Sequence, residues 1–140
     1  MELNLDAYTF GVEIEFTGCT RKTAAAAVAA VLNSSVEYRG EGYDTYAVAD
    51  SRGRLWKVMR DSSVVPEKKA GGRIVSATDD YKCEFVTPVL RYSEDMDTLQ
   101  QIVRAIRSAK GFANESAGVH VHVGGGKPHT RDPAKSRKHF

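Results

Sequence analysis

The chain has 140 residues, of which 41% are hydrophobic and 27% charged, with four prolines. These values are typical of one soluble globular domain and exclude a disordered or fibrous chain. The formal net charge of +2 is unevenly distributed, because residues 127–140 carry five Lys or Arg against one Asp, whereas residues 1–126 carry fifteen basic and seventeen acidic residues. The body of the chain therefore gives no reason to expect nucleic acid or an anionic membrane as a partner.

Nothing in the sequence indicates export or membrane insertion. Residues 1–6 lack the basic and apolar regions of a signal peptide, and the most apolar stretch, residues 24–32, is far shorter than the roughly twenty residues that span a bilayer. Cys19 and Cys83 are distant and form no C-x-x-C pair. We expect a cytoplasmic protein with reduced cysteines.

The first elements have clear patterns. Strict alternation over residues 9–17 predicts a half-buried strand with four apolar side chains on one face, namely Phe10, Val12, Ile14 and Phe16. Thr20 is the predicted N-cap of a helix over residues 21–32, and Asn33 suits its end. The many alanines of this helix indicate close packing against a sheet.

The middle of the chain predicts further strands. A short strand from Val36 precedes a hairpin that pairs residues 45–49 with residues 55–59 across the turn Asp50-Ser51-Arg52-Gly53. Asp61 and Ser63 follow the end of that hairpin, where side chains usually face a cleft or solvent. The Lys- and Gly-rich residues 66–72 are predicted to form a surface loop.

Two strands and a helix are expected in the last part. Residues 81–86 alternate, and Ser93 is the predicted N-cap of an amphipathic helix that closes at Gly111. Residues 118–124 again alternate, and beyond residue 126 the alternation stops. We therefore predict one domain over residues 1–126 and a flexible basic tail over residues 127–140. The element order is that of an α+β fold with a largely antiparallel sheet covered by helices on one face.

Carboxylates and imidazoles are predicted on the sheet face opposite the apolar one, contributed by Glu13, Glu15, Glu84, His120 and His122. Each motif alone is also typical of a solvated outer face. Together they suit a divalent cation, and oxygen-rich ligation favours Mg²⁺ or Mn²⁺ over Zn²⁺. Such ions favour phosphoryl transfer, and because no P-loop motif is present, a nucleotide would be held by metal and basic side chains.

Four blocks of sequence together carry a resemblance to a known family. They are G-V-E-I-E-F at residues 11–16, W-x-V-x-x-D-x-S at residues 56–63, E-F-V-T-P at residues 84–88 and G-V-H-V-H-V at residues 118–123. In this order and spacing they resemble the putative amidoligase family, a branch of the carboxylate-amine ligases related to glutamine synthetase and glutamate-cysteine ligase.

The resemblance implies a glutamine synthetase-like sheet that binds ATP with Mg²⁺ or Mn²⁺ and joins a small-molecule or peptide carboxylate to an amine through an acyl phosphate. By residue matching, it implies that His122 lies near the nucleotide phosphates and that Asp61 and Ser63 are catalytic through metal or amine contact. The metal ligands that it implies are Glu13, Glu15, Glu84 and His120.

The chain departs from the family pattern at its end. Relatives continue beyond the G-x-H-x-H strand, so the resemblance implies an N-terminal fragment whose site is completed by a second chain or a homo-oligomer. An unpaired sheet edge near residues 120–123 would seek such a partner. The alternatives are a non-catalytic remnant that binds metal or nucleotide, and a cupin-like metal protein, since His-x-His on a strand is also a cupin feature.

Overall fold

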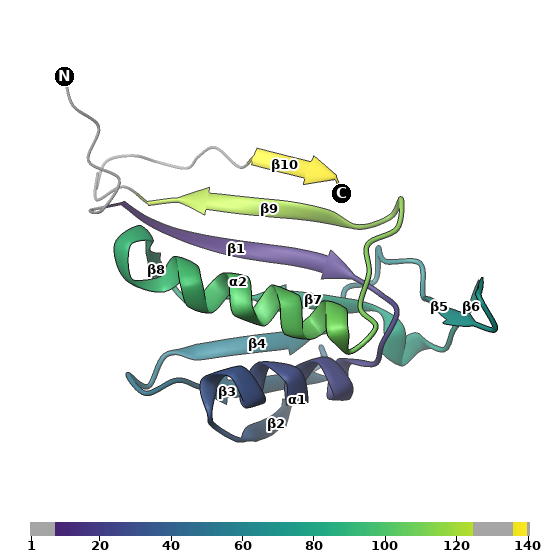
Figure 1. Ribbon diagram of the computed structural model, residues 1–140, viewed down its shortest axis with the longest axis horizontal. Coiled ribbons are helices and arrows are strands. Elements are labelled where there is room, and N and C mark those ends of the chain that lie inside the picture. Colours follow the sequence, from purple (N-terminus) through teal and green to yellow (C-terminus); the bar gives the residue numbers. More distant parts are fainter. Residues whose placement is uncertain (1–7, 125–135, 140) are drawn as a thin grey trace.

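The structure is a computed structural model that describes residues 8–124 and 136–139. An eight-stranded sheet with the strand order β10-β9-β1-β7-β4-β3-β2, in which β8 also pairs with β1, forms one layer (Figure 1). All its strand pairs are antiparallel. Its strands are β1 (Thr9–Phe16), β2 (Val36–Gly40), β3 (Thr45–Ala49), β4 (Leu55–Met59), β7 (Cys83–Val86), β8 (Leu90–Arg91), β9 (Gly118–Val123) and β10 (Ser136–His139).

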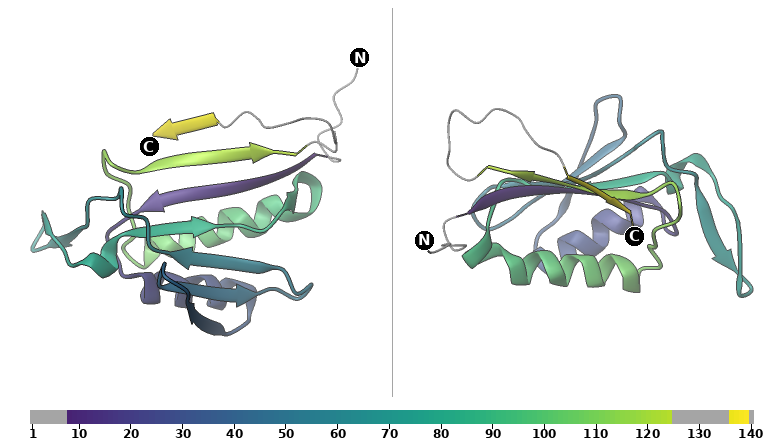
Figure 2. Two further views of the ribbon diagram at one scale, coloured as in Figure 1. Left: turned by 180° about the vertical axis from the view of Figure 1, so that it is seen from behind. Right: turned by 90° about the horizontal axis from the view of Figure 1, so that it is seen from above.

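Two α-helices, α1 (Arg21–Leu32) and α2 (Tyr92–Ser108), cover one face of this sheet. The view along the sheet in Figure 2 shows both helices on the same side, and the ribbon of the described residues leaves the other side open. The core lies between the helices and the sheet, where Trp56, Phe85 and Ile102 are fully buried. The predicted α+β architecture is therefore confirmed, and the face of the sheet that neither helix covers is called the open face below.

Helix α1 has the ends that its sequence predicts. The Thr20 hydroxyl accepts a hydrogen bond from the Thr23 N–H at 3.1 Å, and Asn33 adopts the left-handed conformation with φ of 54°. Ala24 and Ala25 are fully buried. Their small side chains let the helix axis approach its neighbours closely, as the alanine-rich sequence indicates.

Helix α2 begins differently from the prediction. Its N-cap is Arg91, and Ser93 lies inside the first turn without capping it. The Asp95 carboxylate reaches back and accepts a hydrogen bond from the Arg91 N–H at 2.7 Å. Because an acid one turn into the helix satisfies this backbone donor, the helix needs no hydroxyl cap. The expectation that Ser93 caps the helix is wrong.

The predicted surface loop at residues 66–72 is also wrong. It forms the first half of a two-stranded hairpin, β5 (Glu67–Ala70) and β6 (Arg73–Ser76), which projects away from the main sheet in Figure 1. Gly71 and Gly72 turn the hairpin with φ of 59° and 78°, values that favour glycine. Every residue of β6 is exposed, so no apolar alternation marks this strand in the sequence.

The edge of the sheet next to β9 is partly occupied. Strand β10 pairs with β9, with Arg137 opposite His120 in the register. Strand β10 pairs with residues 118–121 of β9, so the expected unpaired edge is absent at residues 120 and 121, while no described strand pairs with residues 122 and 123 on this side. The outer strands are β10 and β2. Of the basic tail predicted to be flexible, residues 127–140, residues 136–139 form β10, whereas residues 127–135 and 140 lie outside the described residues.

Candidate functional site

The strand register places the predicted acidic and histidine side chains on one face. Glu13 of β1 lies directly opposite His120 of β9, and Glu15 of β1 lies opposite Glu84 of β7. His122 lies opposite Gly11, two residues along β1 from Glu13. Directly opposed residues of an antiparallel pair share a face, as do residues two apart on a strand. All five side chains therefore belong to the open face of the sheet.

Three carboxylates form the most compact group on this face. Glu15, Asp61 and Glu84 each offer one oxygen atom, and these atoms lie within 4.8 Å of one another. Asp61 comes from the loop after β4. Such spacing allows one divalent cation to contact all three oxygen atoms. The structure thus brings Asp61 to the predicted metal-binding glutamates.

Ser63 donates two hydrogen bonds to the Asp61 carboxylate. The Ser63 hydroxyl donates to Asp61 Oδ1 at 2.6 Å, and the Ser63 N–H donates to the same oxygen at 2.8 Å. These two bonds leave Asp61 Oδ2 for other contacts and fix the direction of the carboxylate. The D-x-S block is therefore a loop that orients one acid toward the other two.

The crowding of carboxylates changes their proton affinities. Burial, followed by the charges of Asp61, Glu13 and Glu15, raises the pKa of the Glu84 carboxyl to about 7. Burial and the nearby Asp61 charge also raise the pKa of Glu15. For Asp61, burial alone would raise the pKa, but the hydrogen bonds from Ser63, together with the effects of Glu15 and His120, outweigh it and the pKa is lowered. The raised pKa values of Glu84 and Glu15 show that this partly buried site disfavours the ionisation of all three carboxyl groups together.

Glu15 is anchored by the backbone of β9. Its side chain is 4% exposed, and its Oε1 accepts a hydrogen bond from the Gly118 N–H at 2.9 Å. The sequence gives no signal for this donor, because a backbone N–H is present at every residue except proline. The bond holds the most buried of these carboxylates in place.

Two imidazoles lie beside the glutamates. His120 Nδ1 is 3.8 Å from Glu13 Oε1 and His120 Nε2 is 3.9 Å from Glu15 Oε2, while His122 Nε2 is 3.5 Å from Glu13 Oε2. Within the described residues, the Nε2 atoms of both histidines are buried and have no hydrogen-bond partner. Buried polar atoms usually have a partner, so these two nitrogen atoms are placed as ligand-binding atoms would be.

Lys57 is a cation on the same face that the motif analysis missed. It lies opposite Val86, which in turn lies opposite Glu13, so the three residues form one row across β4, β7 and β1. Among the described residues, no carboxylate lies within ion-pair distance of Lys57. Its position between the core residues Trp56 and Val58 is a signal that could have identified it, since alternation places it on the opposite face.

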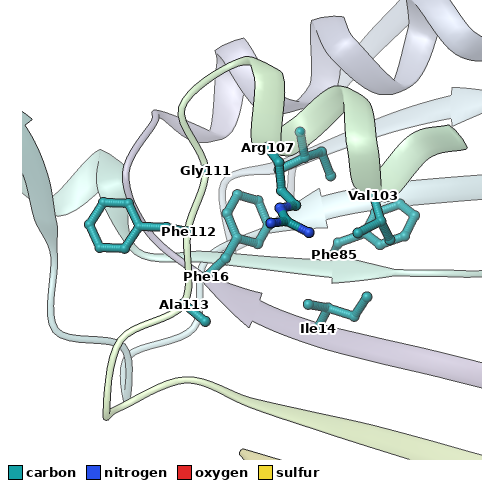
Figure 3. Close-up of a pocket in the computed structure, with 9 residues that line it drawn as sticks. Ile14, Phe16, Phe85, Val103, Arg107, Gly111, Phe112 and Ala113 are labelled. Atoms are coloured by element: carbon teal, nitrogen blue, oxygen red, sulfur yellow. The ribbon is translucent and has the colours of Figure 1, made fainter. Parts of the chain in front are cut away.

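A cavity of about 320 Å³ lies on the other side of the sheet and is separate from this site (Figure 3). Its lining is apolar apart from Arg107 of α2, and Figure 3 shows Ile14, Phe16 and Phe85 on its sheet side. These residues alternate with the acids of β1 and β7. The sheet itself therefore separates the cavity from the carboxylates, and the cavity belongs to the helix-covered core.

Comparison with known proteins gives one match. A family model described as a putative amidoligase enzyme matches residues 6–136. No curated protein matches the chain, and no solved structure matches it. Neither helix in the described part of the chain combines the length and the apolar character that a membrane span requires.

Proposed function

The chain belongs to the family of putative amidoligase enzymes, which are ligase-type enzymes, and on this premise we propose that it is an ATP-dependent carboxylate-amine ligase that uses Mg²⁺ or Mn²⁺. The observation that carries the proposal is the convergence of Glu15, Asp61 and Glu84 within 4.8 Å on the open face, beside two buried imidazole nitrogens that have no hydrogen-bond partner in the part of the chain that the structure describes.

The residues fit divalent cations. Glu15, Asp61 and Glu84 supply the oxygen ligands of one ion, and Glu13 with His120 supplies a carboxylate and an imidazole for a second. His122 lies beside Glu13 and is assigned to the nucleotide and not to a metal ion. When bound, such ions neutralise nucleotide phosphates and polarise the phosphoryl oxygens. Burial and the neighbouring carboxylates raise the pKa of Glu84, and a bound cation would offset the negative charge that they disfavour.

The reaction that we propose has two steps. A carboxylate oxygen of the acid substrate attacks the γ-phosphorus of ATP, the bond from that phosphorus to the β,γ-bridging oxygen breaks, and ADP leaves. The amine nitrogen then attacks the carbonyl carbon of the acyl phosphate, inorganic phosphate departs with the carbon-oxygen bonding pair, and the nitrogen loses a proton. The chain's own residues hold the proposed metal ligands in place: Ser63 positions Asp61, and the Gly118 N–H positions Glu15.

A second candidate is a module that binds metal and nucleotide without turnover. The specific observation in its favour is the scarcity of cations near the acidic group: among the described open-face side chains of β1, β4, β7 and β9, Lys57 is the one Lys or Arg, against four carboxylates at this site. Phosphoryl transfer usually employs cationic clamps on the transferred group. In this reading a second polypeptide or a second copy of the chain would supply them.

The cupin-like alternative is wrong. Cupins are double-sheet jelly rolls, whereas the described residues form one main sheet with two helices on one face. The two histidines of β9 therefore belong to a different architecture from the His-x-His of a cupin.

Binding is the first test. Isothermal titration with MgATP should give a measurable affinity for the wild type and a large loss for Glu15→Gln and His120→Ala. Glu37→Gln is the matched control, because Glu37 is exposed on β2 and its register with Ala47 and then Lys57 places it on the same face. An absence of metal-dependent ATP binding by the folded wild type would refute the proposal.

Turnover separates the two candidate functions. Hydroxylamine is a small amine that converts acyl phosphates to hydroxamates, so it can replace the unidentified amine substrate. Incubation with MgATP and pooled amino acids or short peptides should release ADP and phosphate and form a hydroxamate. Tight MgATP binding without any of these products would favour the binding module.

A further inference from the structure

Gly11 lies inside β1 at a position where folding does not require glycine. Glycine weakens a strand interior, so it usually marks a positive φ, a close backbone neighbour or the approach of a ligand. Gly11 is not among the glycines with positive φ. A Cβ atom added to it would meet Thr87 Oγ1 at 3.9 Å and Pro88 O at 4.0 Å, which are ordinary contacts. Within residues 8–124 and 136–139 neither of the first two reasons applies, which leaves the approach of a ligand.

The missing side chain leaves a hollow in the open face. Its volume is about 280 Å³, and most of its lining surface is apolar. His122 lies opposite Gly11 on β9, and Pro88 follows β7 on the other side. Its lining includes Gly11, Pro88 and His122, and it is also bordered by Phe10 and Val123, whose side chains alternate to the helix-covered face. The hollow therefore has one imidazole wall and one proline wall.

The width of the hollow suits a planar group. Two strand spacings separate β7 from β9, a span of roughly 9.6 Å. A flat ring makes van der Waals contact at about 3.5–4.0 Å on each of its faces. A single ring system standing over Gly11 can therefore touch both walls, and a Val side chain at residue 11 would occupy its place.

The hollow also lies at a useful distance from the acidic group. Gly11 and Glu15 are four residues apart on one strand, which corresponds to about 13 Å. A nucleoside triphosphate has a charged phosphate end and a planar, largely apolar base at the opposite end. With the phosphates near Glu15 and Glu84, a nucleotide that extends along β1 places its base at the hollow. A short carboxylate or amine substrate would reach the acidic group without filling this space.

We propose that the base of the nucleotide substrate sits over Gly11, between His122 and Pro88. His122 lines the hollow, so its imidazole is placed to contact the base. This inference rests on the proposed nucleotide-dependent function and specifies where that nucleotide lies. It makes Gly11 a binding determinant and not a folding requirement.

The test uses two probes that differ only in the base and ribose, namely MgADP and magnesium pyrophosphate, with Gly11→Val as the variant. Affinity for MgADP should fall by about tenfold or more, because the added side chain fills the hollow. Affinity for magnesium pyrophosphate should stay within about twofold of wild type. The melting temperature should rise, since valine suits a strand interior better than glycine. Ala49→Val is the matched control, because it adds similar bulk at an exposed position of β3.

Each other outcome counts against the inference. Unchanged MgADP affinity in Gly11→Val would overturn it, as would an equal loss for both probes, which would place phosphate and not base at the hollow. A fall in melting temperature with loss of both probes would show that glycine serves the fold. A wild type that binds neither probe would instead overturn the proposed function, so the two failures are distinguishable.

Discussion

Glu13 and His120 face each other across the β1–β9 pair, with Glu13 Oε1 3.8 Å from His120 Nδ1. The other oxygen of the same carboxylate lies 3.5 Å from His122 Nε2. One acid therefore lies within reach of both imidazoles. Because no hydrogen bond closes the His122 contact, the arrangement leaves room for a ligand between acid and imidazole.

Glu13→Gln should weaken the binding of Mn²⁺ by about tenfold to a hundredfold, since it replaces a charged ligand by a neutral amide of the same shape. The free energy of unfolding without metal should change by less than about 1 kcal/mol, because the Glu13 side chain is partly exposed and forms no buried ion pair. Titration of Mn²⁺ followed by electron paramagnetic resonance measures the affinity. Glu37→Gln on the same face should leave it unchanged, and an equal loss in both variants would contradict a specific site.

Glu84→Gln should stabilise the metal-free protein by about 1 kcal/mol near pH 8. Burial and three nearby carboxylates penalise the charge of Glu84, as its raised pKa of about 7 records, and glutamine removes that charge. Thermal unfolding with EDTA measures the effect. In saturating Mn²⁺ the wild type should be more stable than Glu84→Gln, because metal binding adds more to the free energy of unfolding of the wild type than to that of the variant. A variant that is less stable than wild type in EDTA would refute the like-charge account.

Asp95→Asn should destabilise the protein by about 3 kcal/mol at pH 7, because Asp95 is buried and binds the guanidinium groups of Arg54 and Arg52. Burial alone would raise the pKa of Asp95, but the hydrogen bond from Arg54 and other partners lower it below its ordinary value. The folded state therefore binds the proton less tightly than the unfolded state. The stability that Asp95 provides is present above its unfolded pKa, near 3.9, and is lost as the pH falls through its lower folded pKa.

Urea denaturation from pH 7 to pH 2.5 tests this prediction. The difference between wild type and Asp95→Asn should shrink as the pH falls below about 4. Asp97→Asn is the control, since Asp97 is exposed on the same helix. A difference that stays constant over this range would show that packing, and not charge, accounts for the effect.

Whether the sequence predicts the position of a site residue depends on whether a strand or a loop carries that residue. Glu13, Glu15, His120 and His122 lie on strands with strict alternation, and a period of two fixes their face without further information. The position of Asp61 depends on the loop after β4, and hydrophobic periodicity does not predict its hydrogen bonds with Ser63. Sequence reasoning could therefore place Asp61 near a cleft but not beside Glu15 and Glu84.

The errors in the fold have similar physical origins. The β5–β6 hairpin buries no apolar face, so its residues carry no pattern that distinguishes them from a loop. At the start of α2 the Asp95 carboxylate accepts a hydrogen bond from the Arg91 N–H, whereas the sequence pattern predicts a hydroxyl cap at Ser93. Both cases involve contacts of individual residues, which hydrophobic periodicity does not encode.

Ala25→Leu should destabilise the protein by about 2 kcal/mol, because Ala25 is fully buried in the core between α1 and its neighbours. Ala26→Leu, one residue along the same helix at an exposed position, should change stability by less than about 0.5 kcal/mol. Alanine and leucine have similar helix propensities, so the pair isolates the effect of space in the core. Urea denaturation of both variants measures it. Equal stability of the two would show that α1 does not depend on the small side chains that its alanine-rich sequence supplies, and that the predicted close packing does not determine its position on the sheet.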